Sequence, residues 1–148
     1  MILRMITIKS NANKISIKLK NLGNIDLSKL MRSLAGDLQD ITEDAFQDEA
    51  DPVTKKPWTD LKKITKDIRR RSGKWPGKKL QVKGRLASSI TTKSGRTTAA
   101  IGTNVTYAGV HQFGSRRTPR RRFIGVSKIH LLSIRNRAEK FVKGKFNK

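Results

Sequence analysis

The chain has no cysteine among its 148 residues, which excludes both a disulfide framework and a thiolate metal site. It also lacks any run that approaches the roughly eighteen apolar residues of a membrane span. The first residues are too short in apolar length and too interrupted by charge for a signal peptide. We therefore expect a soluble protein of a reducing compartment, with no membrane partner.

Residues that carry catalysis are equally scarce. The two histidines, His111 and His130, have no carboxylate close to them in sequence, and the acids lack the spacing of a metal site. No glycine-rich phosphate loop or nucleotide fingerprint is present. We expect neither an enzyme nor a bound cofactor or metal. A toxin-like nuclease is disfavoured because the basic half has no set of His, Glu and Asp.

Negative charge is almost absent from the second half of the chain. The whole chain carries 34 basic and 11 acidic residues, a net charge of +23. Residues 1–60 balance nine of each sign, whereas residues 61–148 hold 25 basic side chains against only Asp67 and Glu139. Self-repulsion of this size opposes a compact state. The distribution indicates a polyanion or an acidic protein surface as the partner.

In the first half, alternation of apolar and polar residues predicts a hairpin with strands at 5–9 and 14–20 around a turn at 11–13. Apolar residues three and four apart from Leu27 to Ala45 predict a long helix, capped by Asp26 or Ser28 and ended at residues 51–52. The opposite face of this helix is acidic: Asp37, Asp40, Glu43, Asp44 and Asp48. Two interpretations stay open, a solvated face or a face that docks the basic half of a neighbouring copy.

In the second half, Thr59 is placed to cap a basic helix that has Leu61, Ile64 and Ile68 on one side and breaks at residues 72–73. Trp75 follows in a linker-like segment, either as a stacking or interface aromatic or as a side chain packed on the core. Leucines, an alanine and serines after Gly84 predict a short helix or turn that opens a strand.

A second hairpin is predicted at 90–93 and 97–102 around a loop at 94–96, followed by a turn at 104–109. The last helix is expected to begin with Ser127 as its cap, with an apolar side made of Ile129, Leu132, Ala138, Phe141 and Val142. Together these elements predict one α+β domain over 1–148. Its small, mostly antiparallel sheet packs against the long N-terminal helix and the C-terminal helix, with flexible basic loops at 72–80 and 114–121 and a frayed tail at 143–148.

Four short motifs in a fixed order carry a family resemblance. They are Pro57-Trp58, the Gly-x-Leu-x-x-Ser-Ile segment at 84–90, the Tyr-Ala-x-x-His-Gln-x-Gly segment at 107–114, and Phe123-Ile124-Gly125 after a proline. Over about residues 40–140 the chain resembles the virion morphogenesis family of tailed phages, the tail-completion proteins of Mu-like and P2-like phages. One departure is the unbroken run of three arginines at 120–122, where the family usually has a small or single basic residue.

The resemblance implies a subunit of the phage neck or tail end that completes the tail and joins it to the DNA-filled head. Its implied partners are further copies in a six-fold ring, other neck, connector or tail-terminator proteins, and genomic double-stranded DNA passing through the ring. Its implied location is the virion neck or tail, with the host cytoplasm during assembly. The alternative is a free-standing basic nucleic-acid-binding protein that uses the same arginines on phosphates.

Residues 107–125 are the expected contact core. The predicted subunit interface consists of Trp58, Tyr107, Ala108, His111, Gln112, Phe113, Gly114, Pro119 and Phe123. For Trp58, packing in the core of its own subunit is the alternative. The predicted contacts to DNA or to an acidic partner are Arg69, Arg70, Arg71, Arg116, Arg117, Arg120, Arg121 and Arg122. We expect the His-Gln pair to close a turn by hydrogen bonds, Gly114 to adopt a positive φ, and Pro119 to stiffen the loop. As the hydrophobic anchor, Phe123 is expected to tolerate replacement by alanine in the isolated protein but not in joining.

Overall fold

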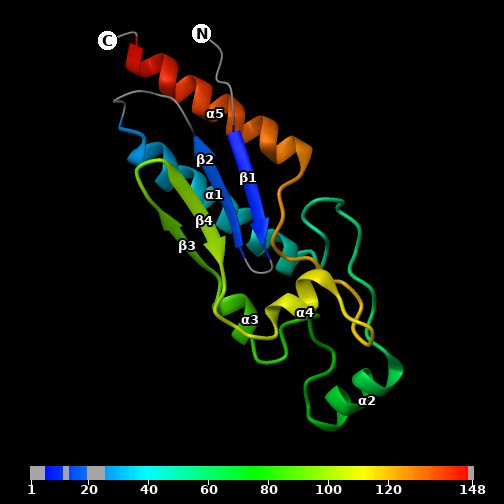
Figure 1. The fold of residues 1–148 in the computed structure, drawn as a ribbon. Coiled ribbons are helices and arrows are strands. Elements are labelled where there is room, and N and C mark those ends of the chain that lie inside the picture. The colour runs from blue at the N-terminus through cyan, green and yellow to red at the C-terminus, as the bar shows by residue number, and fades with distance from the viewer. Residues whose placement is uncertain (1–5, 12–13, 20–25, 147–148) are drawn as a thin grey trace.

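A computed structural model describes residues 6–11, 14–19 and 26–146. Its elements are β1 Ile6–Asn11, β2 Lys14–Leu19, α1 Ser28–Gln47, α2 Lys63–Arg71, α3 Arg85–Ser88, β3 Thr91–Ser94, β4 Thr98–Gly102, α4 Ala108–Phe113 and α5 Lys128–Phe146. The predicted α+β fold is confirmed (Figure 1). In the part of the chain that these ranges cover, no helix combines the length and the hydropathy of a membrane span.

Four antiparallel strands form one sheet in the order β1-β2-β4-β3. Both predicted hairpins are confirmed, and the β2–β4 pairing, with Ile17 opposite Ala99, joins them into a single sheet. Residues 5, 12–13 and 20 of the predicted first hairpin lie outside the described residues. The buried face expected for that hairpin rests on side chains that also lie outside the description.

Helix α1 lies behind the sheet in Figure 1, and its buried residues explain why. Leu30, Leu34 and Leu38 recur every four residues and are almost fully buried, and Ala99 and Ile101 of β4 are buried with them. Burial of each such leucine stabilises the fold by about 2 kcal/mol. The Asp26 carboxylate accepts a hydrogen bond of 2.9 Å from the Ser28 N–H. Asp26 therefore supports the helix start as expected, although Leu27 occupies the cap position itself.

Helix α1 ends earlier than predicted, at Gln47 rather than at residues 51–52. Glu49 adopts the left-handed region with φ +52°, which turns the chain before the proline can act. The Glu49 carboxylate is held by the Lys79 ammonium at 2.9 Å, and the Glu49 carbonyl accepts a hydrogen bond of 2.7 Å from the Trp58 N–H. Long-range contacts thus decide where this helix ends.

Helix α2 contradicts the predicted cap, and the side on which Ile64 and Ile68 lie together faces solvent. Ile64 and Ile68 are 68% and 59% exposed, whereas the buried residue of the helix is Arg69. The helix begins at Lys63 and not after Thr59. The reason is that the Thr59 carbonyl accepts a hydrogen bond from another part of the chain, which holds residues 59–61 outside the helix. The predicted break is confirmed, with Gly73 at φ +67°.

Helix α5 begins at the predicted cap: the Ser127 hydroxyl accepts a hydrogen bond from the His130 N–H at 3.2 Å, and His130 Nδ1 accepts one from the Ser127 N–H at 3.3 Å. Its predicted apolar side is half wrong. Ile129 and Leu132 are exposed, and the buried side chains that recur every four residues are Ile134, Ala138 and Val142, with Phe141 packed against the core. The helix extends through Phe146 into the tail that was expected to fray, and residues 147–148 lie outside the described part.

Candidate functional site

Helix α4 presents the side chain that closes the 107–125 segment. Sequence patterns predicted only a turn at 104–109, because six residues are too few to show a helical period. Gln112 Nε2 donates a hydrogen bond of 2.6 Å to the Ile124 carbonyl, and its Oε1 accepts hydrogen bonds of 3.1 Å from the Phe123 and Ile124 N–H groups. One buried amide therefore pairs three backbone groups ten or more residues away. The predicted closure by hydrogen bonds is made by Gln112.

The histidine of the same pair contributes through its backbone. The His111 carbonyl accepts a hydrogen bond of 2.8 Å from the Arg121 N–H, while its buried Nδ1 has no partner among the described residues. The ring stands edge-on to Tyr107 at 5.9 Å between centroids. Burial, and then the charge of Arg121, lowers the His111 pKa below its usual value. The imidazole is therefore neutral at neutral pH.

Trp58 and Phe123 form the aromatic centre of the subunit itself. Phe123 is 0% exposed and lies 5.4 Å from Phe46 between ring centroids, and Trp58 meets Phe46 edge-on at 5.8 Å. Trp58 Nε1 donates a hydrogen bond of 2.8 Å to the Arg122 carbonyl. This corrects the expectation that Phe123 is an anchor for a neighbour and tolerates replacement by alanine, because its ring already fills the core of its own chain.

Residues 114–119 form a compact turn after α4. Gly114 has the expected positive φ, +80°, and a Cβ at this position would lie 3.1 Å from the Arg120 nitrogen. The Ser115 N–H donates to the Thr118 carbonyl at 2.8 Å, just before Pro119. The close approach of Gly114 to Arg120 therefore folds the arginine loop back on α4.

Two arginines of the predicted contact set are buried and support the backbone. Arg121 is 6% exposed, and its guanidinium donates to the Thr59 and Asp60 carbonyls at 2.9 and 3.1 Å. Arg69 is 7% exposed and donates to the Lys78 carbonyl at 3.0 Å. Burial, and then the charge of Arg69, lowers the Arg121 pKa. Both side chains serve the fold of this chain, which no sequence pattern distinguished from the exposed arginines beside them.

The other arginines divide further. Arg122 Nε lies 3.4 Å from Asp51 Oδ2, an ion pair without hydrogen-bond geometry, and Arg70 pairs with Asp67 at 2.5 Å. The remaining members of the predicted set are exposed, and within the described residues no acidic side chain pairs with them: Arg71, Arg116, Arg117 and Arg120. Within the predicted set, these four have charge to offer a partner.

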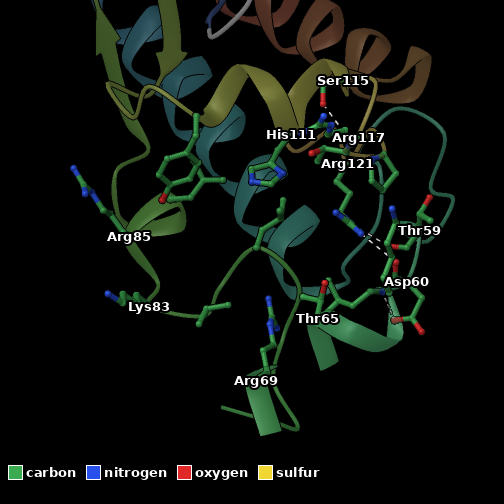
Figure 2. Close-up of a pocket in the computed structure, with 18 of the residues that line it drawn as sticks. Thr59, Asp60, Thr65, Arg69, Lys83, Arg85, His111, Ser115, Arg117 and Arg121 are labelled. Atoms are coloured by element: carbon green, nitrogen blue, oxygen red, sulfur yellow. Dashed lines mark hydrogen bonds between the residues drawn. The ribbon is translucent and has the colours of Figure 1, made fainter. Parts of the chain in front are cut away.

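A groove with a cavity volume of about 850 Å³ lies between α2, α3 and α4 (Figure 2). Its apolar lining includes Leu61, Leu80, Val82, Leu86 and Tyr107, and its basic lining includes Lys62, Lys83, Arg85, Arg116 and Arg117 together with the buried Arg69 and Arg121. Asp60 is the one carboxylate in the lining, and it pairs with Lys66 at 2.5 Å. Lys83 and Arg85 were not singled out in the sequence, although they flank the motif glycine Gly84.

The exposed members of the predicted interface lie along α4. Tyr107 and Phe113 are 41% and 48% exposed, and Val110, which sequence analysis did not select, is exposed between them. Ala108 and Gln112 of the same helix are buried in the subunit. The interface role of the whole set stays a prediction. The geometry divides it into side chains that shape the segment and side chains that a neighbour can reach.

Trp75, the linker tryptophan, is half-buried on α2. The Lys66 ammonium lies 5.4 Å from the ring centroid, a cation–π contact that covers one face of the indole. The ring therefore packs against α2, the helix that precedes it.

Among the described residues, no group of three or more His, Cys, Asp or Glu side chains gathers at a metal-binding distance.

The sequence profile of the phage virion morphogenesis family matches residues 8–143. The chain belongs to the phage virion morphogenesis family. It is 36% identical over 105 residues to capsid assembly protein G of Escherichia phage Mu, an alignment that covers 70% of this chain and 67% of that protein. It is 35% identical over 130 residues to the Mu-like prophage FluMu G protein 1 of Haemophilus influenzae, covering 86% of this chain and 88% of the relative.

No solved structure matches the chain significantly. The family and both relatives give the chain a role in phage structure or assembly, as the four sequence motifs predicted. Three of these motifs meet at residues 122–124, because Trp58 donates a hydrogen bond to the Arg122 carbonyl and Gln112 bonds the backbone of Phe123 and Ile124. The motif residues thus include those that build the 107–125 segment.

Proposed function

We propose that the chain is a non-enzymatic structural subunit of the phage neck or tail end. It completes the tail and joins it to the DNA-filled head as a ring of identical subunits. The observation that carries this proposal is a rigid, concave, basic surface beside an exposed aromatic helix face. Such a surface suits docking onto other proteins, because aromatic side chains supply contact area at a low cost in conformational entropy.

The hydrogen bonds under this surface support the same function. Gln112, Arg121 and Arg69 each fix backbone carbonyls below the groove, so the surface is held in shape before a partner arrives. A surface that is already ordered loses less entropy on binding. The buried side chains of the motifs therefore hold the surface in shape. The exposed side chains of Tyr107, Val110 and Phe113 contact the partner.

DNA is a further partner in this proposal. The exposed arginines Arg71, Arg116, Arg117 and Arg120 can neutralise phosphates without reading sequence, which allows a duplex to slide through a ring. The alternative function, a free-standing nucleic-acid-binding protein, is favoured by the net charge of +23 alone. A free binder holds DNA as a monomer, with an affinity that falls steeply between about 50 and 200 mM salt, whereas a neck subunit binds weakly until it is assembled.

Head-to-tail joining in extracts tests the proposal. Heads and tails from a phage that lacks this protein are mixed with purified chain, and infectious particles and electron micrographs are scored. Phe113→Asp adds a charge to the α4 face, and we expect it to reduce joining at least about tenfold while the protein stays folded. Ile129→Asp, which adds the same charge at a 77% exposed isoleucine of α5, is the matched control. Normal joining by a chain that forms no rings would contradict the ring.

A further inference from the structure

The C-terminal part of helix α1 carries a row of exposed carboxylates that form no ion pair within the described residues. Asp40, Glu43 and Asp44 lie on the helix, Asp48 is the cap residue directly after it, and all four are exposed. The Glu43 carboxylate accepts a hydrogen bond from Gln39 at 2.8 Å. Within the described residues, no lysine or arginine forms an ion pair with any of the four, whereas Asp37 one turn earlier pairs with Arg137 at 2.7 Å.

Within this row the carboxylates repel one another. Like charges four residues apart on a helix repel each other, and the row occupies the last turns of α1, where the helix dipole already disfavours negative charge. The last turn of α1 contains no basic residue to offset it. The chain therefore places four of its carboxylates at the end of a helix that disfavours negative charge. This placement suits a surface that binds a cationic partner.

The groove carries an excess of positive charge. Lys83, Arg85, Arg116 and Arg117 line it, and in the described part of the chain none of them pairs with a carboxylate. Figure 2 shows Lys83 and Arg85 on one side of the groove and Arg117 and Arg121 on another. No residue of α1 lines the groove, so the acidic row and the groove are two different surfaces of one subunit.

We propose that the groove of one subunit binds the acidic end of α1, residues 40–48, of the next subunit. A contact between two different surfaces repeats around a ring and closes when the rotation fits, which is the geometry a ring of identical subunits needs. A helix whose exposed face carries carboxylates is complementary in charge to a groove that cations line.

This inference rests on the proposed ring and names its interface. A charge swap tests it in the full-length protein. Arg117→Glu and Asp44→Lys are each expected to weaken subunit association about tenfold or more, because each places like charges across the contact. The two substitutions combined restore an attractive pair and are expected to return the association constant to within about threefold of the original. Sedimentation velocity at low and high salt measures all four proteins, and the losses shrink at high salt.

The matched control has the same net charge as the double variant, but places the new glutamate outside the groove. Lys93 is exposed on the edge strand β3, outside the groove, so Asp44→Lys combined with Lys93→Glu has the same charge as the swap. We expect this pair to remain as weak as Asp44→Lys alone. Equal rescue by both pairs, or no rescue by the swap, overturns the inference.

Two further outcomes separate this inference from the proposed function. If Arg117→Glu abolishes binding of a labelled DNA duplex and leaves subunit association unchanged, the groove is a DNA site and the inference is wrong. If the chain forms rings whose stability no charge change affects, the interface assignment is wrong while the ring and the joining assay stand. A chain that stays monomeric at every concentration also refutes this interface, and the joining assay then decides its function separately.

Discussion

Two regions of this protein are stabilised in different ways. The helix–sheet region, made of the four strands with α1 and α5, buries leucines, alanines and isoleucines at regular spacing. The clamp region, made of α2, α3, α4 and residues 49–62 and 114–127, is held by polar side chains that reach backbone groups far away in the sequence. An arginine-rich segment with few apolar residues can therefore be rigid, provided that its carbonyl groups find buried donors.

The same comparison explains why the arginines are not one functional set. In the clamp region Arg69 and Arg121 are buried donors, while Arg116, Arg117 and Arg120 within a few residues are exposed. Substituting a buried donor leaves carbonyl groups unpaired, whereas substituting an exposed arginine removes only charge. Stability and assembly should therefore respond to different arginines of a single loop.

The largest effect is expected where the two regions meet. Phe123→Ala removes a fully buried ring packed on Phe46, and we expect a loss of about 3–5 kcal/mol in the free energy of unfolding. Chemical denaturation followed by tryptophan fluorescence measures it. Phe113→Ala, on the exposed side of α4, is expected to change stability by less than about 0.5 kcal/mol. Equal, small losses would show that the aromatic centre does not connect the regions.

The amide of Gln112 tests whether polar groups hold the clamp region. Gln112→Leu keeps most of the volume but leaves two N–H groups and one carbonyl without their partner, and we expect a loss of about 3 kcal/mol. Gln112→Glu preserves the acceptor and should lose less at low pH, where the protonated acid can donate to the Ile124 carbonyl. Thermal unfolding across pH distinguishes the two variants. A stable Gln112→Leu protein would assign the region to apolar packing instead.

Arg121→Ala should cost about 2 kcal/mol, because the Thr59 and Asp60 carbonyls lose a charged donor. Its neighbour provides the control, since Arg120→Ala removes an exposed guanidinium and is expected to leave stability within about 0.5 kcal/mol. Differential scanning calorimetry compares the two proteins. If both substitutions destabilise equally, the division of the arginine run into buried and exposed members is wrong.

The smallest effect is a pH dependence shared by both regions. Burial, and then nearby positive charge, lowers the pKa of His111 in the clamp region and of His130 at the start of α5. Below about pH 6.5 the unfolded chain binds more protons than the folded one, so stability is fully present above this pH and falls as pH decreases. We expect a loss of about 1 kcal/mol or less between pH 7 and pH 5, small because both rings are partly exposed.

His111→Gln should reduce this loss and leave the remainder to His130. Urea denaturation at the two pH values measures the difference. The carboxylate of Glu49 does not interfere: burial raises its pKa, but hydrogen bonds and charge from Lys79 outweigh this and lower it. Its contribution is therefore lost only in more acid solution. Stability that rises on acidification to pH 5 would contradict the direction of both histidine shifts.

The helix–sheet region was largely predictable because its pattern is local. Hairpin alternation, the four-residue repeat of Leu30, Leu34 and Leu38, and the Ser127 cap each express themselves within a few residues. The clamp region was predictable where a motif resembled a known family and where a glycine ends a helix, as Gly73 does after α2. Its helix α2 reads as amphipathic in sequence, yet Ile64 and Ile68 are exposed and Arg69 is buried, since the carbonyls that need Arg69 belong to residues 77 and 78.

The groove could not have been predicted from residue patterns, because its lining comes from helices α2, α3 and α4 and from the loops at 59–62, 80–84 and 115–121. In the chain, Lys83 and Arg85 precede Arg117 by about thirty residues. The three side chains line one groove only after α3 and α4 are positioned. The acidic row on α1 was visible in sequence, as was the basic second half. That the row is unpaired within the described residues, and that the cations line a concave surface, are facts of tertiary structure.

By itself, the sequence determined the α+β class, the two hairpins, the long first helix, the excess of positive charge and the family, because each depends on local periodicity, composition or short motifs. Only the tertiary structure decided which arginines are buried donors, that Phe123 fills its own core, and where the groove lies. The physical reason is that a guanidinium or an aromatic ring is buried or exposed according to partners 8 to 64 residues away in the chain, and sequence spacing carries no record of them.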